Sequence, residues 1–173
     1  MASYYYLISS LPDLKSDGEM PVSYSEFLDM CKGQVSKDKY RLLENLTFSS
    51  KKGPLVEEWA RVYDPVMEEL NYQRNVKLGK PCQAPAKRTP EVTQRVNAIL
   101  GAKNPLQAEK MMLAFEFQLL DELVGLHMFD DYVLFGYAIK LKLMERQQCF
   151  DHDKGQKEFR RLMDIVRQRV YAL

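Results

Sequence analysis

The sequence is poor in the residues from which reactive sites are usually built. It has only three cysteines, Cys31, Cys82 and Cys149, and two histidines among 173 residues. The cysteines are widely spaced and form no CxxC pair, which argues against a disulfide framework and favours a reducing, cytoplasmic environment. The sequence also has no GxxxxGK[ST] phosphate loop, no GxGxxG turn and no GxSxG elbow. These absences argue against nucleotide hydrolases, dinucleotide enzymes and α/β-hydrolases.

Long apolar runs and a charge excess are missing as well. The longest uninterrupted apolar run, residues 132–139, has eight residues, far fewer than the roughly 20 that a transmembrane helix needs. The N-terminus lacks the basic and apolar regions of a signal peptide. The net charge is only +1, whereas a nucleic-acid binder usually carries a clear basic excess. We therefore predict a protein that neither spans a membrane nor binds nucleic acid.

Two small groups of residues resemble parts of metal sites. His127 lies close to Asp130 and Asp131, and Cys149 lies three residues before His152. A metal site needs three or four ligands that converge, and these two groups lie at opposite ends of one predicted helix. Capping of the helix N-terminus and its macrodipole explain the two aspartates. We therefore expect no metal site here.

Two further acidic patterns are equally weak evidence for chemistry. Residues 151–155 resemble the start of a calcium loop, but Leu162 stands where the bidentate glutamate should be. The glutamate pairs at 57–58 and 68–69 are adjacent in sequence, so on a helix their side chains point in different directions. We interpret these pairs as solvated surface and predict no catalytic residue and no cofactor.

The apolar residues recur at helical spacing. In residues 106–126 the apolar positions follow steps of three or four, and no segment shows sustained two-residue alternation. This pattern predicts an all-α protein, an antiparallel bundle of about seven to eight helices with short connections. The residues of this stripe are Met112, Phe115, Leu119, Leu123 and Leu126.

Capping residues and prolines predict where the helices begin and end. Ser23 and Glu26 form a capping box, and Gly79 suits the residue after a helix end. Proline follows Thr89 and Asn104, as it often does at a first helical position. Pro65 either kinks or divides the helix that begins near Pro54. The remaining predicted N-caps are Ser36, Asp130 and Asp153.

Residues 80–89 form the clearest linker, because they contain two prolines and little apolar content. We accordingly predict an N-terminal helical lobe over residues 1–79, a linker over 80–89 and a C-terminal helical lobe over 90–173. Packing of the two lobes into one domain is the alternative.

Charge is distributed unevenly along the second half of the chain. Residues 104–131 carry a net −5, whereas residues 140–173 carry a net +4. A long helix from Asp130 to about Cys149, a short polar break and a basic amphipathic helix make up the last third. We interpret this third as a helical hairpin that packs on itself and on another surface. The charge asymmetry indicates either a protein partner or a self-complementary helix pair.

Three segments carry a resemblance to a known family. They read YYYLISSLP from Tyr4, YSEFLDMC from Tyr24 and GYAIKLKLMERQQCFDHDKGQKEFRRLM from Gly136. They resemble a family of uncharacterised bacterial proteins encoded among the subunits of V-type (archaeal-type) ATP synthases. The last segment is also similar to the C subunit of those enzymes, called d in eukaryotes, an all-helical adaptor between the membrane rotor ring and the central stalk.

The resemblance implies a non-catalytic structural or accessory subunit of a bacterial V-type ATP synthase. It implies partners in the central stalk or membrane rotor and a cytoplasmic location peripheral to the inner membrane. A stand-alone helical adaptor with another partner is the alternative. An enzyme with an unrecognised site, for instance around His127 and Asp131, is a third possibility.

Candidate contact residues come from tyrosines and from basic side chains. Three consecutive tyrosines, residues 4–6, cannot all face one core on a helix or a strand. Tyrosine suits interfaces because it combines a large apolar area with a polar tip. The basic residues of the C-terminal helix form a solvated polar face by default. Docking onto an acidic protein surface is the functional alternative, and binding to anionic lipid is a third and weaker one, because acidic residues are interspersed among the basic ones. We predict partner contacts by Tyr5, Tyr137, Lys142, Arg146, Arg160 and Arg161.

Overall fold

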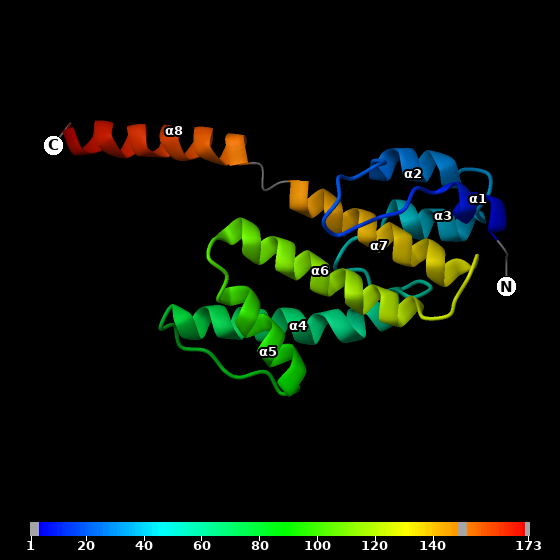
Figure 1. Cartoon of the computed structure of the whole chain (residues 1–173), viewed down its shortest axis with the longest axis horizontal. Helices are drawn as coiled ribbons and strands as arrows, with labels where there is room; N and C mark the ends of the chain where they lie inside the picture. Colours follow the sequence, from blue (N-terminus) through cyan, green and yellow to red (C-terminus); the bar gives the residue numbers. More distant parts are fainter. Residues whose placement is uncertain (1–3, 149–151, 172–173) are drawn as a thin grey trace.

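The structure is a computed structural model that describes residues 4–148 and 152–171. Those residues form eight helices and no strand, which confirms the all-α fold (Figure 1). The helices are α1 (Tyr5–Ser10), α2 (Tyr24–Cys31), α3 (Lys37–Glu44), α4 (Val56–Lys77), α5 (Pro90–Leu100), α6 (Pro105–Val124), α7 (Asp131–Gln148) and α8 (His152–Tyr171). Helices α1 to α7 form a bundle, and α8 extends away from it.

Some of the predicted helix boundaries have the local capping interactions that the sequence indicates, whereas Ser36 and Thr89 are N-caps without a side-chain hydrogen bond. The Ser23 hydroxyl accepts a hydrogen bond from the Glu26 amide at 3.2 Å, and the Ser23 amide donates to the Glu26 carboxylate at 2.8 Å. Asn104 caps α6 by accepting a bond from the Gln107 amide at 2.8 Å. Gly79 follows α4 with φ of +64°, a left-handed conformation that glycine adopts without strain.

One boundary differs from the sequence prediction, and one of the two alternatives at Pro65 is excluded. Helix α4 runs without interruption for 22 residues, so Pro65 lies inside it and does not divide it. Helix α8 begins at His152, which places Asp153 in its first turn and not at the N-cap. Such shifts of a residue are common because helix ends depend on a few weak bonds. Cys149 lies outside the described residues.

One cluster of buried side chains is shared by both halves of the chain. Phe27 and Trp59 come from the first 79 residues, whereas Leu113 and Phe135 come from α6 and α7. Helices α6 and α7 make the most extensive contact, α4 packs on α5 and α6, and α2 packs on α7. Lys140 pairs with Asp121 and the later Arg146 with the earlier Glu116, so α6 and α7 are antiparallel.

Helix α8 does not pack on α7 as the hairpin interpretation requires. None of the helix pairs in substantial contact includes α8. Every α8 side chain whose exposure is described is exposed to solvent. The interpretation of the last third as a self-packed hairpin is therefore wrong for residues 131–148 and 152–171.

No helix within the described ranges combines the length and the apolar character that crossing a bilayer requires.

Glu69 contradicts the prediction that the adjacent glutamates are solvated. Its side chain is only 2% exposed and lies under Arg88, which donates from Nε and Nη2 to the two carboxylate oxygens at 2.8 Å each. Gln73 donates a third bond at 2.8 Å. The prediction failed because the linker folds back over α4 and brings Arg88 to this carboxylate.

This pair gives a testable dependence of stability on pH. The hydrogen bonds from Arg88 hold the pKa of Glu69 below its usual value of 4.5. The carboxylate of Glu69 therefore binds a proton more readily in the unfolded chain than in the folded one. The resulting stabilisation of the folded state is complete above pH 4.5 and is lost as the pH falls through the pKa of the folded state. The Arg88 side chain is 36% exposed and is therefore screened by solvent. For this reason we expect the pair to contribute only about 1 kcal/mol to the free energy of unfolding at neutral pH.

The measurement is urea unfolding of the wild type and of Glu69→Gln between pH 7 and pH 3. The advantage of the wild type should shrink on acidification. Glu57→Gln removes an exposed carboxylate from the same helix and serves as the control. An advantage of the wild type that stays constant down to pH 3 would contradict the assignment.

Candidate partner-binding surfaces

Helix α8 is the most exposed amphipathic element of the structure. Phe159 is 63% exposed and Leu162 is 56% exposed, and Met163 and Ile165 are also exposed. From His152 to Tyr171 the sequence has six Lys or Arg residues and three Asp or Glu residues, a net +3. The rest of the chain therefore carries a net −2, because the whole chain carries +1. An exposed apolar stripe on a helix is typical of a docking element.

The two predicted contact residues of α8 lie on its surface. Arg161 is 69% exposed and pairs with Glu158 at 3.1 Å. Arg160 is exposed as well. Because exposed pairs of this kind contribute little to stability, both guanidinium groups remain available to an acidic surface.

Arg146 has a different environment from Arg160 and Arg161. Its Nη1 and Nη2 donate to the two oxygens of Glu116 at 2.8 and 2.6 Å, and Nη1 also donates to the Tyr63 hydroxyl at 3.3 Å. Glu116 is completely buried. Burial raises the pKa of Glu116, and the hydrogen bonds from Arg146 oppose that rise. Arg146 thus joins α7 to α6 and α4, and its predicted contact with a partner stays a prediction.

Lys142 and Tyr137 also have partners within the chain. The Lys142 Nζ lies 3.7 Å from the centre of the Tyr24 ring and 3.1 Å from a Glu145 carboxylate oxygen. The Tyr137 hydroxyl donates to the carbonyl oxygen of Pro12 at 3.0 Å. This bond fixes the loop between α1 and α2 against α7.

A second exposed aromatic group lies at the start of the described chain. Tyr5 is 54% exposed and Tyr6 is 85% exposed. The Tyr5 ring contacts the rings of Phe129 and Tyr6, with centroids 4.7 and 5.5 Å apart. The Tyr4 amide donates to the Phe129 carbonyl at 2.7 Å, which joins α1 to the start of α7. Tyr5 is thus placed on the surface, far along the sequence from the basic residues of α8.

The residues around His127 form pairs and not a ligand cluster. His127 Nδ1 lies 2.6 Å from Asp130 Oδ2, and its ring stacks on Tyr132 at 4.3 Å. Asp130 also caps α7 by accepting from the Tyr132 and Val133 amides, as the sequence predicts. Asp131 instead pairs with Lys39 at 2.5 Å. In residues 4–148 and 152–171 no group of three or more His, Cys, Asp or Glu residues is arranged to hold a metal ion.

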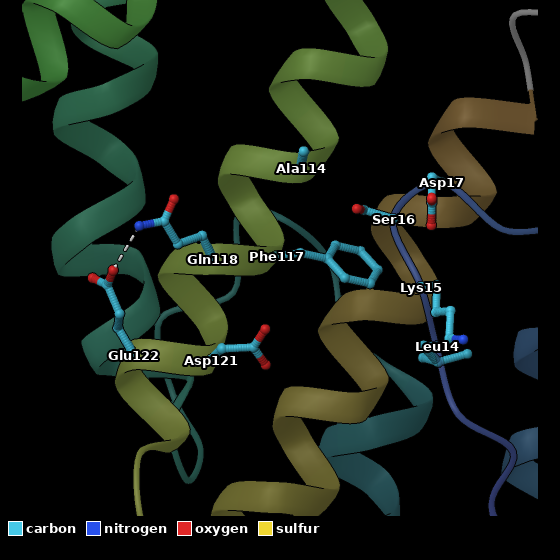
Figure 2. A pocket seen from close by; sticks show the side chains of 9 residues that line it. All are labelled: Leu14, Lys15, Ser16, Asp17, Ala114, Phe117, Gln118, Asp121 and Glu122. Carbon is cyan, nitrogen blue, oxygen red and sulfur yellow. Dashed lines mark hydrogen bonds between the residues drawn. The ribbon is translucent and has the colours of Figure 1, made fainter.

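Three pockets lie in a row along α6 and the loop that joins α1 to α2, and residues of α7 line the two outer ones. We call this row the α6 groove. Its central part, of about 620 Å³, is open to solvent and lies between loop residues 14–17 and the α6 residues around Phe117 (Figure 2). A second part, of about 350 Å³, shares Leu14 and Asp121 with the first and continues to Val133 and Tyr137.

The other end of the α6 groove reaches the start of α6 and the end of α7. This third part, of about 360 Å³, begins at Gly18, next to the central part, and is lined by Leu106, Met144 and Gln148. Five acidic and two basic side chains line the three parts together, a net −3. They are Asp13, Asp17, Glu19, Asp121 and Glu122, with Lys15 and Lys140.

Comparison with known proteins adds one finding. Residues 90–170 match the model of a family described as "Protein of unknown function (DUF2764)". The match covers just under half of the chain, from the first residue of α5 almost to the end of α8. No curated protein and no solved structure matches the chain.

Sequence reasoning missed two features of these surfaces. Glu116 interrupts the apolar stretch MMLAFEFQLL, and a charge at that place is a signal for a buried pair. Its partner Arg146 lies 30 residues away, and the sequence gives no indication that the two side chains meet. The α6 groove has no sequence signal of its own, because it is formed by a loop and two helices that meet only in the folded chain.

Proposed function

We propose that this protein is a non-catalytic accessory subunit of a bacterial V-type ATP synthase, which binds subunits of the central stalk or membrane rotor through its outer surface. It acts at the cytoplasmic side of the inner membrane as an adaptor between other subunits. The observation that carries the proposal is helix α8, which presents an exposed apolar stripe and a net positive charge outside the bundle.

Two further observations support an adaptor. The segment from Gly136 to Met163, which carries the resemblance to the C subunit, includes most of α7 and the first half of α8. The bundle below it is held by a buried ion pair and a continuous core, as a part that transmits force between other subunits requires. Stiffness of this kind follows from close packing of helices.

The test is co-purification from detergent-solubilised native membranes with a tag on the full chain. The wild type should recover subunits of the ATP synthase. Arg160→Glu/Arg161→Glu should reduce the recovery about tenfold, because reversing two charges at an acidic interface costs roughly 1–2 kcal/mol.

Lys52→Glu/Arg61→Glu is the matched control, since these two basic residues are also exposed but lie in and just before α4, far from α8 in the sequence. It should recover the complex as the wild type does. A wild-type chain that recovers no ATP synthase subunit refutes the proposal. Equal losses for the two double variants would show that α8 is not the contact.

A further inference from the structure

The α6 groove and α8 have complementary charge. The groove is lined by a net −3 and α8 carries a net +3. The acidic side chains come from both sides of the groove, with Asp17 on the loop and Asp121 on α6 (Figure 2). The basic residues of α8 flank its apolar stripe, as Arg160 does next to Phe159. Such an arrangement favours one docking orientation and speeds association.

The two outer parts of the groove add apolar contacts. The groove exposes or partly exposes Leu106 from α6 and Leu11 and Met20 from the loop. Helix α8 offers Phe159, Leu162 and Met163, which are all exposed. An amphipathic helix laid into an apolar groove with a polar rim is a common mode of recognition.

The lengths agree as well. From Leu106 to Val124 the groove follows α6 for about 27 Å, given the rise of about 1.5 Å per residue. The 20 residues of α8 extend for about 30 Å by the same rise. The α6 groove is therefore long enough to cover most of the apolar stripe of α8.

We infer that in the free protein the α6 groove is the docking site for α8 of a second copy, so that two copies exchange their C-terminal helices. Helix α8 extends away from its own bundle (Figure 1), which is the arrangement of an exchanged arm. The exchange is reciprocal: each copy buries its stripe in the groove of the other. This interface is independent of the ATP synthase proposal and is tested on the purified protein alone.

Sedimentation equilibrium of the full chain tests the stoichiometry. The wild type should be a dimer at micromolar concentration. Leu162→Glu should raise the dimer Kd at least about tenfold, because it places a negative charge in the apolar stripe of α8, opposite an acidic groove. Leu78→Glu, at a comparably exposed leucine outside both surfaces, should leave the Kd unchanged.

A variant on the other surface tests the groove itself. Ala114 is exposed and lines the central part of the α6 groove (Figure 2). Ala114→Trp fills this part without changing α8, and it should weaken the dimer as Leu162→Glu does. A dimer that resists Ala114→Trp but not Leu162→Glu would form through α8 alone and would refute the inference.

Disulfide cross-linking identifies the copy that supplies the helix. The background is Cys82→Ser/Cys149→Ser; Cys31 is kept, because burial raises the pKa of its thiol to about 12 and makes it unreactive. One copy then carries Leu162→Cys and the other Ala114→Cys, both at central positions, so the pair meets in either helix direction. Oxidation of the mixture should yield a cross-linked heterodimer.

Three outcomes refute the inference. A wild type that is monomeric throughout the micromolar range has no exchanged arm. A disulfide that forms only within one chain, in Ala114→Cys/Leu162→Cys, places α8 in its own groove. A dimer that cross-links through Leu162→Cys alone is held by contact between two α8 helices.

Discussion

Replacing Arg146 with methionine is expected to destabilise the bundle by about 3–5 kcal/mol, a large part of the total stability of a domain this size. The change leaves the Glu116 carboxylate completely buried without its two strongest hydrogen bonds. Each ion of a buried pair gives up its hydration on folding, and the attraction of its partner compensates for that loss. Removing one partner therefore reduces the free energy of unfolding by far more than the intact pair adds to it. Urea unfolding followed by far-UV circular dichroism at pH 7 measures the loss.

The loss should depend on pH in a defined direction. Burial already raises the pKa of Glu116, and without Arg146 nothing of comparable strength opposes that rise. A raised folded pKa stabilises the folded state at low pH, and this contribution is lost as pH rises through the folded pKa. The deficit of Arg146→Met relative to the wild type should therefore be smaller at pH 5 than at pH 7.

The double variant Arg146→Met/Glu116→Leu is the decisive control. Replacing both members of a buried pair by apolar residues of similar size is often neutral. It should regain most of the stability that Arg146→Met loses. A double variant no more stable than the single one would show that Arg146 acts through packing and not through the charge of Glu116.

Gly136→Ala should destabilise the protein by about 1–2 kcal/mol, although alanine is the better helix former by roughly 1 kcal/mol. A Cβ atom at this position would lie 2.7 Å from Val124 Cγ2 and 3.3 Å from Leu55 Cδ2. The valine side chain is stiff at χ1 and cannot turn away without strain. The absence of a side chain at residue 136 is therefore what lets α7 approach the end of α6.

Gly155→Ala provides the matched control, because a Cβ atom there has nothing within 4 Å. It should raise the helicity of α8 and leave the unfolding midpoint of the bundle unchanged. Adding Val124→Ala to Gly136→Ala should restore part of the lost stability. If the two changes are simply additive, the close contact between these residues is not the cause.

Helix positions were predictable because their signals are local. The capping box at Ser23 and Glu26, the asparagine before Pro105 and the glycine after α4 each act within four residues, and each has its predicted role. The sequence left open whether Pro65 kinks or divides this helix, because a proline inside a helix is tolerated only when surrounding packing compensates for the lost hydrogen bond.

The candidate surfaces were predictable only in part, because they depend on contacts between residues far apart in the sequence. The amphipathic character of α8 is visible in its sequence, but that no other helix of the described residues packs closely on it is a property of the whole fold. Arg146 and Arg160 are both basic residues of predicted helices, and only the antiparallel register of α6 and α7 gives Arg146 a buried partner. Glu69 likewise depends on how the linker returns over α4.

The separation of charge between α8 and the bundle also affects how fast the molecule finds a partner. A net +3 at one end and a net −2 over the rest give it an electric dipole moment along its long axis. Such a molecule rotates in the field of an acidic surface and arrives helix first, which increases the fraction of productive collisions. At 0.1 M salt this field decays over about 10 Å. Added salt should therefore lower the association rate constant with an acidic partner by a larger factor than it raises the dissociation rate constant.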